Sequence, residues 1–156
     1  MTVLMVDATL RVSAPLILAA LAGLFAERSG VVDIALEGKL LGAAFAAATV
    51  AAVSQSAWLG LASGIGFSVG LSMIHAYACV THKGDQVVSG MAINILVAGL
   101  GPTLALAWFR LGGQTPRVEG SGRFHPLNWP GAEAFESTPI VGGLYSEIIS
   151  GHNIIV

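Results

Sequence analysis

The fold depends on residues 29–42, SGVVDIALEGKLLG, which place two carboxylates and a lysine between runs that are otherwise apolar. Arg28 followed by Gly30 is typical of the end of a helix. Asp33, directly before IALEG, is a residue type that commonly caps the start of one. We therefore predict that one helix ends near Gly30 and that the next begins at Ile34, with Asp33 as its N-cap.

The three charges of this stretch allow a structural and a functional interpretation. Asp33 and Glu37 would lie near the positive end of the new helix, on one face because they are four residues apart. Lys39 would lie roughly opposite, with its ammonium reaching toward the membrane surface. Capping explains Asp33, whereas Glu37 lies a turn inside the helix. An intramembrane carboxylate is by default a functional candidate, although an amide or arginine of another helix would also satisfy it.

The composition is typical of a membrane protein. Hydrophobic residues make up 54% of the 156 residues and charged residues only 10%, and the mean hydropathy is +0.78. These values lie far to the apolar side of an average soluble domain. The seven Lys and Arg are scattered singly, so the sequence lacks the basic stripe of a nucleic-acid-binding surface. We expect the lipid bilayer to be the surroundings of the chain and nucleic acid not to be a partner.

Cysteine and histidine usage predicts neither a disulfide nor a metal site. Cys79 is the only cysteine, and the four histidines are dispersed along the chain, which is unlike a local metal motif. We expect no metal and no cofactor. The N-terminal residues MTVLMVDATLR lack a basic leader and a small-residue cleavage site, so we expect them to belong to the mature chain.

Three apolar runs are long enough to span a bilayer, which takes roughly 20 helical residues. They are residues 34–53, 57–81 and 87–109. Residues 13–26 form a shorter run that spans only if its helix extends back toward Val3. We predict an all-α fold, a polytopic transmembrane helix bundle with about four membrane segments plus the start of a fifth.

The chain divides into three regions by composition. Residues 1–109 are predicted to form the transmembrane helical region. Residues 110–138 are rich in Gly, Pro and charge and predict an extramembrane loop, long enough to suggest a role. Residues 139–156 become apolar again and predict the start of a further membrane segment.

Small residues predict close helix packing. Two pairs of glycines four residues apart, Gly60 with Gly64 and Gly66 with Gly70, occur in one apolar run. Such pairs let helix backbones approach where hydrophobic burial no longer drives association. Asn94 interrupts another run and must find polar partners in hydrocarbon. It predicts an interhelical hydrogen bond or, alternatively, a side chain that lines a substrate path.

Two motifs suggest an enzyme and fail on inspection. Residues 66–70, GFSVG, fit the G-x-S-x-G pattern, but on one helix Ser68 and His75 are separated by about 10 Å of rise, and a strand-to-helix elbow is missing. Gly38-Lys39 resembles the end of a phosphate-binding loop, yet Asp33 and Leu40 stand where that loop requires Gly and Ser or Thr. An intramembrane hydrolase is thus a weak hypothesis, and we predict no catalytic residue in this chain.

Two longer motifs carry a family resemblance. Residues 25–47 read FAERSGVVDIALEGKLLGAAFAA and residues 84–100 read GDQVVSGMAINILVAGL, and the apolar segments around them occur in matching order. The sequence resembles the membrane permease subunits of bacterial ABC importers, in the ribose and branched-chain amino acid type permease family, nucleoside and simple-sugar branch. The resemblance covers nearly the whole chain.

The resemblance implies a multi-pass protein of the bacterial inner membrane that forms part of a translocation path. Its implied partners are a second permease subunit, a cytoplasmic ATPase subunit that hydrolyses the ATP, and an extracytoplasmic substrate-binding protein. It also implies that residues 82–86 face the cytoplasm and residues 110–138 the outside. The arginines of that outer loop oppose this orientation by the positive-inside rule; we follow the family orientation.

The sequence departs from the family pattern at several places. The family usually has Asn where this chain has Asp33, which puts a neutral substrate contact in doubt, and an apolar residue, often Met, where it has Lys39. The chain also ends where the family continues, so we expect it to correspond to the N-terminal half of a permease.

The candidate path-lining residues are Asp33, Glu37, Ser89 and Asn94. The alternative to a transporting subunit is a truncated or split permease half that needs a second chain and does not transport alone.

Overall fold

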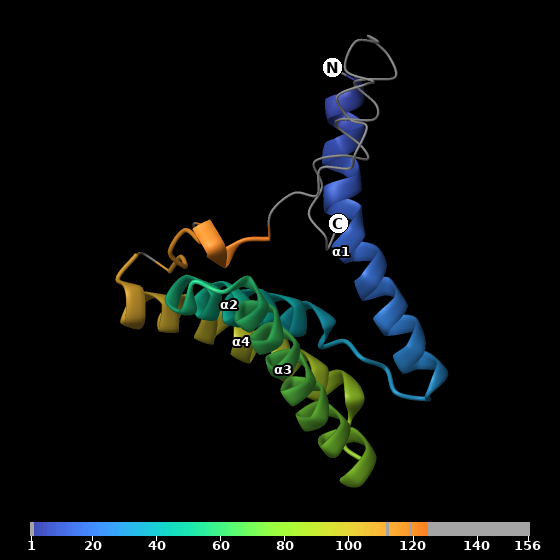
Figure 1. The fold of residues 1–156 in the computed structure, drawn as a ribbon. Coiled ribbons are helices and arrows are strands. Elements are labelled where there is room, and N and C mark those ends of the chain that lie inside the picture. Colours follow the sequence, from blue (N-terminus) through green and yellow to red (C-terminus); the bar gives the residue numbers. More distant parts are fainter. Residues whose placement is uncertain (1, 112, 119, 125–156) are drawn as a thin grey trace. The chain divides into compact units, whose positions relative to one another are not determined.

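The described residues fold into helices. A computed structural model describes residues 2–111, 113–118 and 120–124, and no strand occurs among them. Helix α1 spans Thr2–Arg28, α2 Leu36–Ser54, α3 Ala57–Ala76 and α4 Gln86–Phe109 (Figure 1). A π-helical segment, η1 (Tyr77–Thr81), continues α3, and a short 3₁₀ turn, η2 (Gly120–Gly122), follows α4. The predicted all-α class is confirmed.

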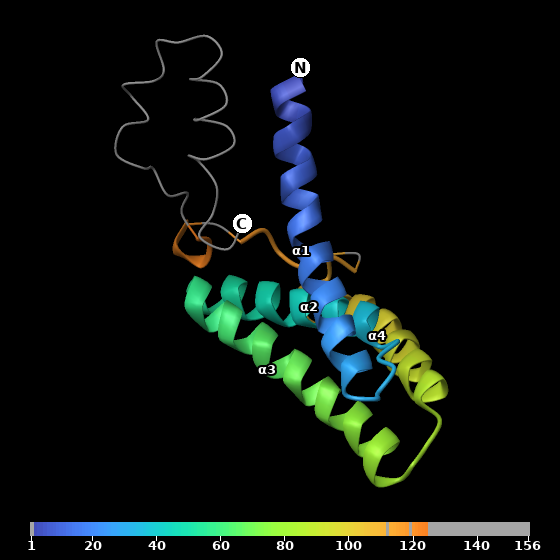
Figure 2. The ribbon, with the colours of Figure 1, turned by 90° about the vertical axis from the view of Figure 1, so that its right-hand side faces the viewer.

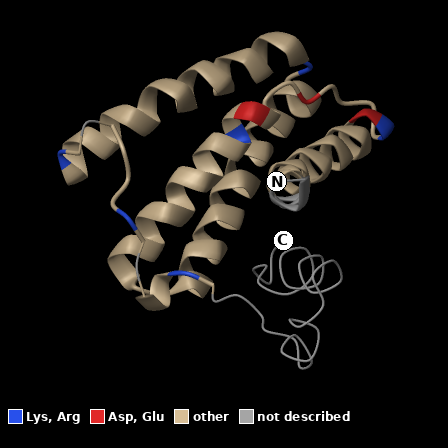
Figure 3. Ribbon diagram, turned by 90° about the horizontal axis from the view of Figure 1, so that it is seen from above, with Lys and Arg blue, Asp and Glu red and all other residues tan. Residues whose placement is uncertain are grey.

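Three of the described helices are long and apolar enough to cross a membrane: α2, α3 together with η1, and α4. Their bounds agree with the predicted runs 34–53, 57–81 and 87–109 within two residues. No Asp, Glu, Lys or Arg occurs in α3, η1 or α4, and α2 contains only Glu37 and Lys39, near its start. Charge on these three helices is accordingly confined to one place (Figure 3).

The remaining predicted segments stay predictions. Helix α1 is continuous through Pro15 but is not among the three candidate spans found in the described part of the chain. Residues 139–156, where a further membrane segment is expected, lie outside the described residues, as does most of the predicted loop 110–138.

Local sequence explains where α1 ends and α4 begins. Helix α1 ends at Arg28, and Gly30 has a φ of +85°, a conformation that glycine adopts at little cost. Asp85 caps α4, because its carboxylate accepts hydrogen bonds from the backbone N–H groups of Val87 and Val88 at 2.8 and 3.0 Å.

The predicted start of α2 is wrong by two residues. The helix begins at Leu36, its N-cap position is occupied by Ala35, and Ala35 makes no side-chain capping bond. The cause lies in Asp33, whose Oδ1 accepts a hydrogen bond from the Ala35 N–H at 3.1 Å and closes a local turn before the helix starts. Such turns compete with helix formation at Asp and Asn.

Residues 21–123 form one unit of packed helices, and residues 2–20 are described as part of helix α1 alone. Within the unit, α2 packs against both α3 and α4 (Figures 1 and 2). The central apolar contact is made by Ala35, Leu71, Ile93 and Val97, all of them buried. Large side chains such as Ile95 are exposed instead, as expected for helices that face lipid or further helices.

The close contact between α2 and α3 depends on glycine. A Cβ atom at Gly60 would lie 2.7 Å from the Ala51 Cβ and 2.9 Å from the Ala47 carbonyl oxygen, and one at Gly64 would lie 3.1 Å from the Ala43 carbonyl oxygen. At Gly66 and Gly70 a Cβ would meet no described atom within 4 Å. The structure thus places the first predicted pair at a helix contact and the second pair outside one.

This difference predicts opposite effects of one substitution at two positions of α3. Gly60→Ala should destabilise the helix unit by roughly 1–3 kcal/mol, because the added methyl forces α2 and α3 apart. Gly66→Ala should be neutral or stabilise by about 0.5–1 kcal/mol, because alanine is the better helix former. Denaturant unfolding of the purified chain in detergent measures both effects. Equal effects of the two substitutions would contradict the assigned contact.

Candidate functional site

Helix α2 begins inside the bundle. The extended residues before it run along the first turns of α4, where the Val32 N–H donates to Gln86 Oε1 at 2.6 Å. The first turn of α2 instead meets Asn94, which lies eight residues beyond Gln86, or about 12 Å farther along α4. The start of α2 is therefore set deeper than the start of α4, and the Gly38 N–H of its first turn points toward α4.

Asn94 provides hydrogen-bond partners for backbone groups at the start of α2. Its Oδ1 accepts a hydrogen bond from the Gly38 N–H at 2.7 Å, and its Nδ2 donates to the Ile34 carbonyl oxygen at 2.9 Å. The Gly38 N–H has no partner within a helix that starts at Leu36. Asn94 thus makes the interhelical hydrogen bond that its place in an apolar run indicated, and it does so to the backbone.

Two glycines allow this close approach. A Cβ atom at Gly38 would lie 2.7 Å from Asn94 Oδ1, and one at Gly90 of α4 would lie 3.0 Å from the Ile34 Cβ and 3.1 Å from the Ala35 nitrogen. Contacts of this length leave no room for a larger residue. The backbone at the helix start therefore lies directly against α4 at Gly90 and Asn94.

Lys39 is buried, which corrects the prediction that its side chain extends to the membrane surface. It is 5% exposed, and its Nζ lies 2.5 Å from Asp33 Oδ2. Side chains of a helix point back toward its N-terminus, and Asp33 precedes α2 in a turn. Lys39 therefore reaches over the first turn to the carboxylate and does not point away from it.

His75 joins α3 to the same place. Its ring is buried, its Nδ1 shares a hydrogen bond of 3.1 Å with Ser89 Oγ of α4, and its Nε2 lies 3.9 Å from Asp33 Oδ1. The Cys79 sulfur of η1 lies 3.7 Å from the ring. We refer to Asp33, Lys39, His75 and Ser89 as the polar cluster. It links the start of α2 to α3 and α4.

The polar cluster contains the residue types of a Ser-His-Asp triad but not its geometry. A general base and its partners need hydrogen bonds of about 2.6–3.2 Å, whereas His75 and Asp33 are 3.9 Å apart. Both Asp33 oxygens are also engaged, by the Ala35 N–H and by Lys39. Ser68, the nucleophile of the hydrolase hypothesis, lies within the continuous helix α3 and not on the elbow that a nucleophile motif requires.

Glu37 differs from the other predicted site residues. Asp33 and Ser89 belong to the polar cluster and Asn94 caps α2, whereas Glu37 is exposed in the first turn of α2. Its carboxylate stands beside the positive end of the helix dipole, which favours negative charge. Of the four residues, it is the one with room to contact another molecule or another helix.

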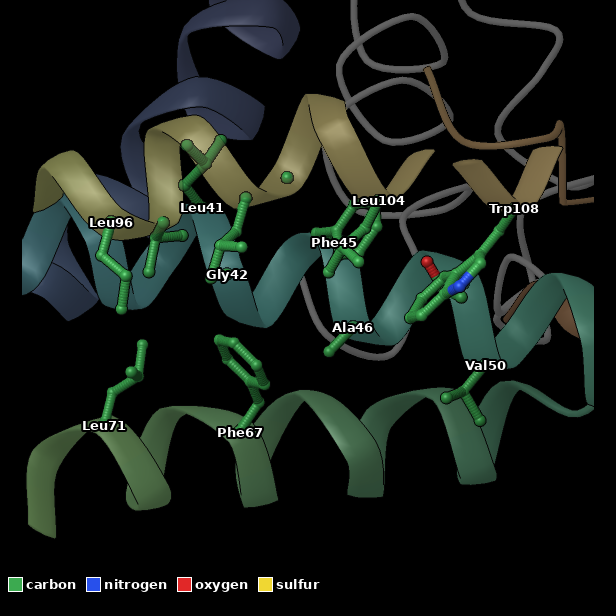
Figure 4. Close-up of a pocket in the computed structure, with 14 residues that line it drawn as sticks. Leu41, Gly42, Phe45, Ala46, Val50, Phe67, Leu71, Leu96, Leu104 and Trp108 are labelled. Atoms are coloured by element: carbon green, nitrogen blue, oxygen red, sulfur yellow. The ribbon is translucent and has the colours of Figure 1, made fainter. Parts of the chain in front are cut away.

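An apolar pocket of about 250 Å³ lies farther along α2, between α2, α3 and α4 (Figure 4). Phe45, Phe67, Leu71 and Trp108 are among its lining residues, and the rings of Phe45 and Trp108 stack with centroids 6.3 Å apart. Thr49 also lines it, with a buried hydroxyl that has no hydrogen-bond partner among the described residues. A ligand rich in hydroxyl groups would leave most of them unpaired here, which costs free energy.

Three apolar helices, a helix start set inside the bundle and a polar cluster beside it define a multi-pass membrane protein. Residues 5–135 match the family model described as the permease component of the branched-chain amino acid transport system. The chain therefore belongs to this permease family.

Curated relatives carry more specific names. The chain is 36% identical over 149 residues to the guanosine ABC transporter permease protein of Bacillus subtilis, a match that covers 91% of this chain and 44% of the relative. It is 33% identical over 106 residues to the nucleoside ABC transporter permease protein of Lactococcus lactis, covering 64% of this chain and 33% of the relative. The chain is also 35% identical over 104 residues to a protein of Haloferax volcanii that is provisionally named as a glucose ABC transporter permease. That match covers 67% of this chain and 32% of the relative.

These relatives are much longer than the match, since the chain spans between 32% and 44% of their length. No solved structure matches the chain. Membership of the permease family is thus established by sequence.

Sequence reasoning missed three parts of the site. His75 was weighed only as a base for Ser68, although an ionisable residue in an otherwise uncharged membrane helix is itself a signal of function or pairing. Gln86 and Gly90 carry no such signal, because their roles depend on which backbone atoms α2 brings against α4.

Removing the Asn94 side chain tests its role at the start of α2. Asn94→Ala should lower the free energy of unfolding by roughly 1–3 kcal/mol, because the Gly38 N–H and the Ile34 carbonyl lose their partners. Ile95→Ala is the control, since that side chain is 71% exposed on the same helix. Amide hydrogen exchange in detergent should show faster exchange at Gly38 only in the Asn94 variant. Unchanged exchange at Gly38 would contradict the capping role.

Proposed function

We propose that this chain contributes helices to the translocation path of an ATP-binding-cassette importer for nucleosides or simple sugars in the bacterial inner membrane. ATP hydrolysis belongs to a separate cytoplasmic ATPase subunit, a second permease subunit completes the path, and an extracytoplasmic binding protein delivers the substrate. Membership of the permease family and the names of the relatives support this proposal.

The observation that carries the proposal is the start of α2 inside the bundle. Transporters commonly place substrate and ion sites where a membrane helix is interrupted, because free backbone groups and the helix dipole are available there. Here residues 29–35 connect α1 to α2, and the only charged residues of α2, α3 and α4 follow directly, in the first turn of α2. Polar groups in this position suit a substrate that carries hydroxyl groups.

We assign different roles to the four candidate residues. Glu37, which is exposed, would contact the substrate, with its carboxylate accepting hydrogen bonds from hydroxyl groups. The other three candidates, Asp33, Ser89 and Asn94, would hold the helices that line the path in place without contacting the substrate. Their polar atoms are engaged within the bundle. The apolar pocket near Trp108 is less suited to the substrate, since its lining offers few hydrogen-bond partners.

The orientation follows from the family. We propose that the turn at residues 82–86 faces the cytoplasm and that residues 110–138 face the extracytoplasmic side, near the binding protein. Ser121 Oγ donates to the Gln55 carbonyl oxygen at 2.6 Å, so η2 lies against the turn between α2 and α3, and we place both at the extracytoplasmic end.

The alternative is a permease half that does not transport by itself. The match covers less than half of each relative, so a path like theirs would need helices beyond those of the match. Uptake measured with this chain as its only permease polypeptide, and again together with a full-length permease partner, separates the two. Uptake in the first case supports a transporting subunit.

Neutralising Glu37 tests the site. In the transporter assembled with its ATPase and binding protein, Glu37→Gln should lower uptake of radiolabelled guanosine or glucose about tenfold, the scale of a charge-assisted hydrogen bond. Assembly should be unchanged, because Glu37 is exposed.

The matched control is Glu27→Gln, an exposed carboxylate in the last turn of α1, which should leave uptake intact. Native uptake by the Glu37 variant would remove this residue from the path while leaving the transport proposal standing. Absence of ATP-dependent uptake by the unaltered complex would count against the transport proposal itself.

A further inference from the structure

We propose that Asp33 and Lys39 form a compensated ion pair that positions the start of α2, and that the bundle tolerates loss of their charges only when both are lost together. The two residues then act on the path through the fold and do not contact the substrate. The statement about the substrate rests on the proposed function. The pairing itself concerns the helix unit of residues 21–123.

Burial makes the pair interdependent. The side chains of Lys39 and Asp33 are 6% and 12% exposed, and the ammonium and carboxylate lie 2.5 Å apart. Removing one partner leaves a buried charge without compensation, which is strongly destabilising, whereas replacing both by neutral groups of similar shape is often tolerated.

His75 is the one ionisable neighbour from the packed helices, and no permanently charged side chain of those helices can replace a lost partner. The packed helices α3 and α4, with η1, contain no Asp, Glu, Lys or Arg. His75 is the one ionisable ring that faces Asp33 from α3, at 3.9 Å, and it is held by Ser89. The Cys79 thiol lies beyond His75 and touches the ring. Glu37 is exposed rather than buried with Lys39.

Asp33 has a second task that does not need its charge. Its Oδ1 accepts a hydrogen bond from the Ala35 N–H and so forms the turn that precedes α2. An asparagine amide oxygen accepts the same bond and forms the same kind of turn. Methionine has nearly the length of the lysine stem and lacks its charge. Asp33→Asn combined with Lys39→Met should therefore keep the turn and remove both buried charges.

Cys79 provides a built-in reporter of this region. It is the only cysteine of the chain, it is 7% exposed, and its sulfur lies 3.7 Å from the His75 ring. The rate at which N-ethylmaleimide modifies it depends on how often the polar cluster and the helices around it open. Circular dichroism and gel filtration of the same samples separate local opening from global unfolding.

The experiment compares the full chain and its variants in detergent micelles. Asp33→Asn alone and Lys39→Met alone should each raise the rate of Cys79 modification roughly 100-fold, the scale expected for an unpaired buried charge. The double variant should return close to the native rate. Glu27→Gln, which alters an exposed carboxylate outside the cluster, is the control and should not change the rate.

Two results would overturn the pairing. One is a native rate of Cys79 modification in both single variants. The other is a double variant whose rate increase equals the product of the two single increases. A single variant that fails to fold still leaves the double variant to decide. Uptake by the assembled transporter tests the positioning role: in the two single variants it should fall together with the protection of Cys79. Loss of uptake with Cys79 still protected would show that the pair contacts substrate. Because modification needs no transport, failure of the transport proposal leaves the pairing result intact.

Discussion

The hydrogen bonds at the start of α2 are the constraint on which the rest of this helix unit depends. A helix that starts inside an apolar bundle has N–H groups that water cannot reach, and each must be paired within the protein. Asn94 of α4 pairs the Gly38 N–H, and Asp33 pairs the N–H of Ala35. The Asp33 bond is local, whereas the Asn94 bond requires close approach of α2 and α4, which Gly38 and Gly90 permit. The depth of α2, the position of Lys39 and the approach of His75 follow from this arrangement.

The unit separates polar and apolar chemistry along α2. Its first turn holds the only charged residues of the three candidate spans, and the polar cluster there draws on all three helices. Farther along, Phe45 and Trp108 border a pocket in which Thr49 is the one unpaired buried hydroxyl among the described residues. A polar solute finds partners at the first place and few at the second. This division supports the proposal that the substrate binds near Glu37.

Sequence reasoning located the helices well because their signals are local. Each signal involves residues close together in sequence: the apolar runs, the helix end marked by Arg28 and Gly30, and the glycine pair Gly60 and Gly64. It misjudged the start of α2 because Asp33 can either cap a helix or close a turn ahead of it, and its sequence neighbours do not distinguish the two. It misplaced Lys39 because a free lysine at a helix start extends to the membrane surface unless a buried carboxylate accepts it.

The sequence by itself determined the class, the apolar helices and the family, since composition, periodicity and two motifs suffice for these. It also marked Asp33, Glu37, Ser89 and Asn94 as unusual in their surroundings. Only the tertiary structure decided that Asn94 caps α2, that Asp33 pairs with Lys39 and that His75 lies between Ser89 and Asp33. These contacts join residues up to 60 positions apart, and which polar atoms meet in an apolar bundle depends on how deeply each helix is set.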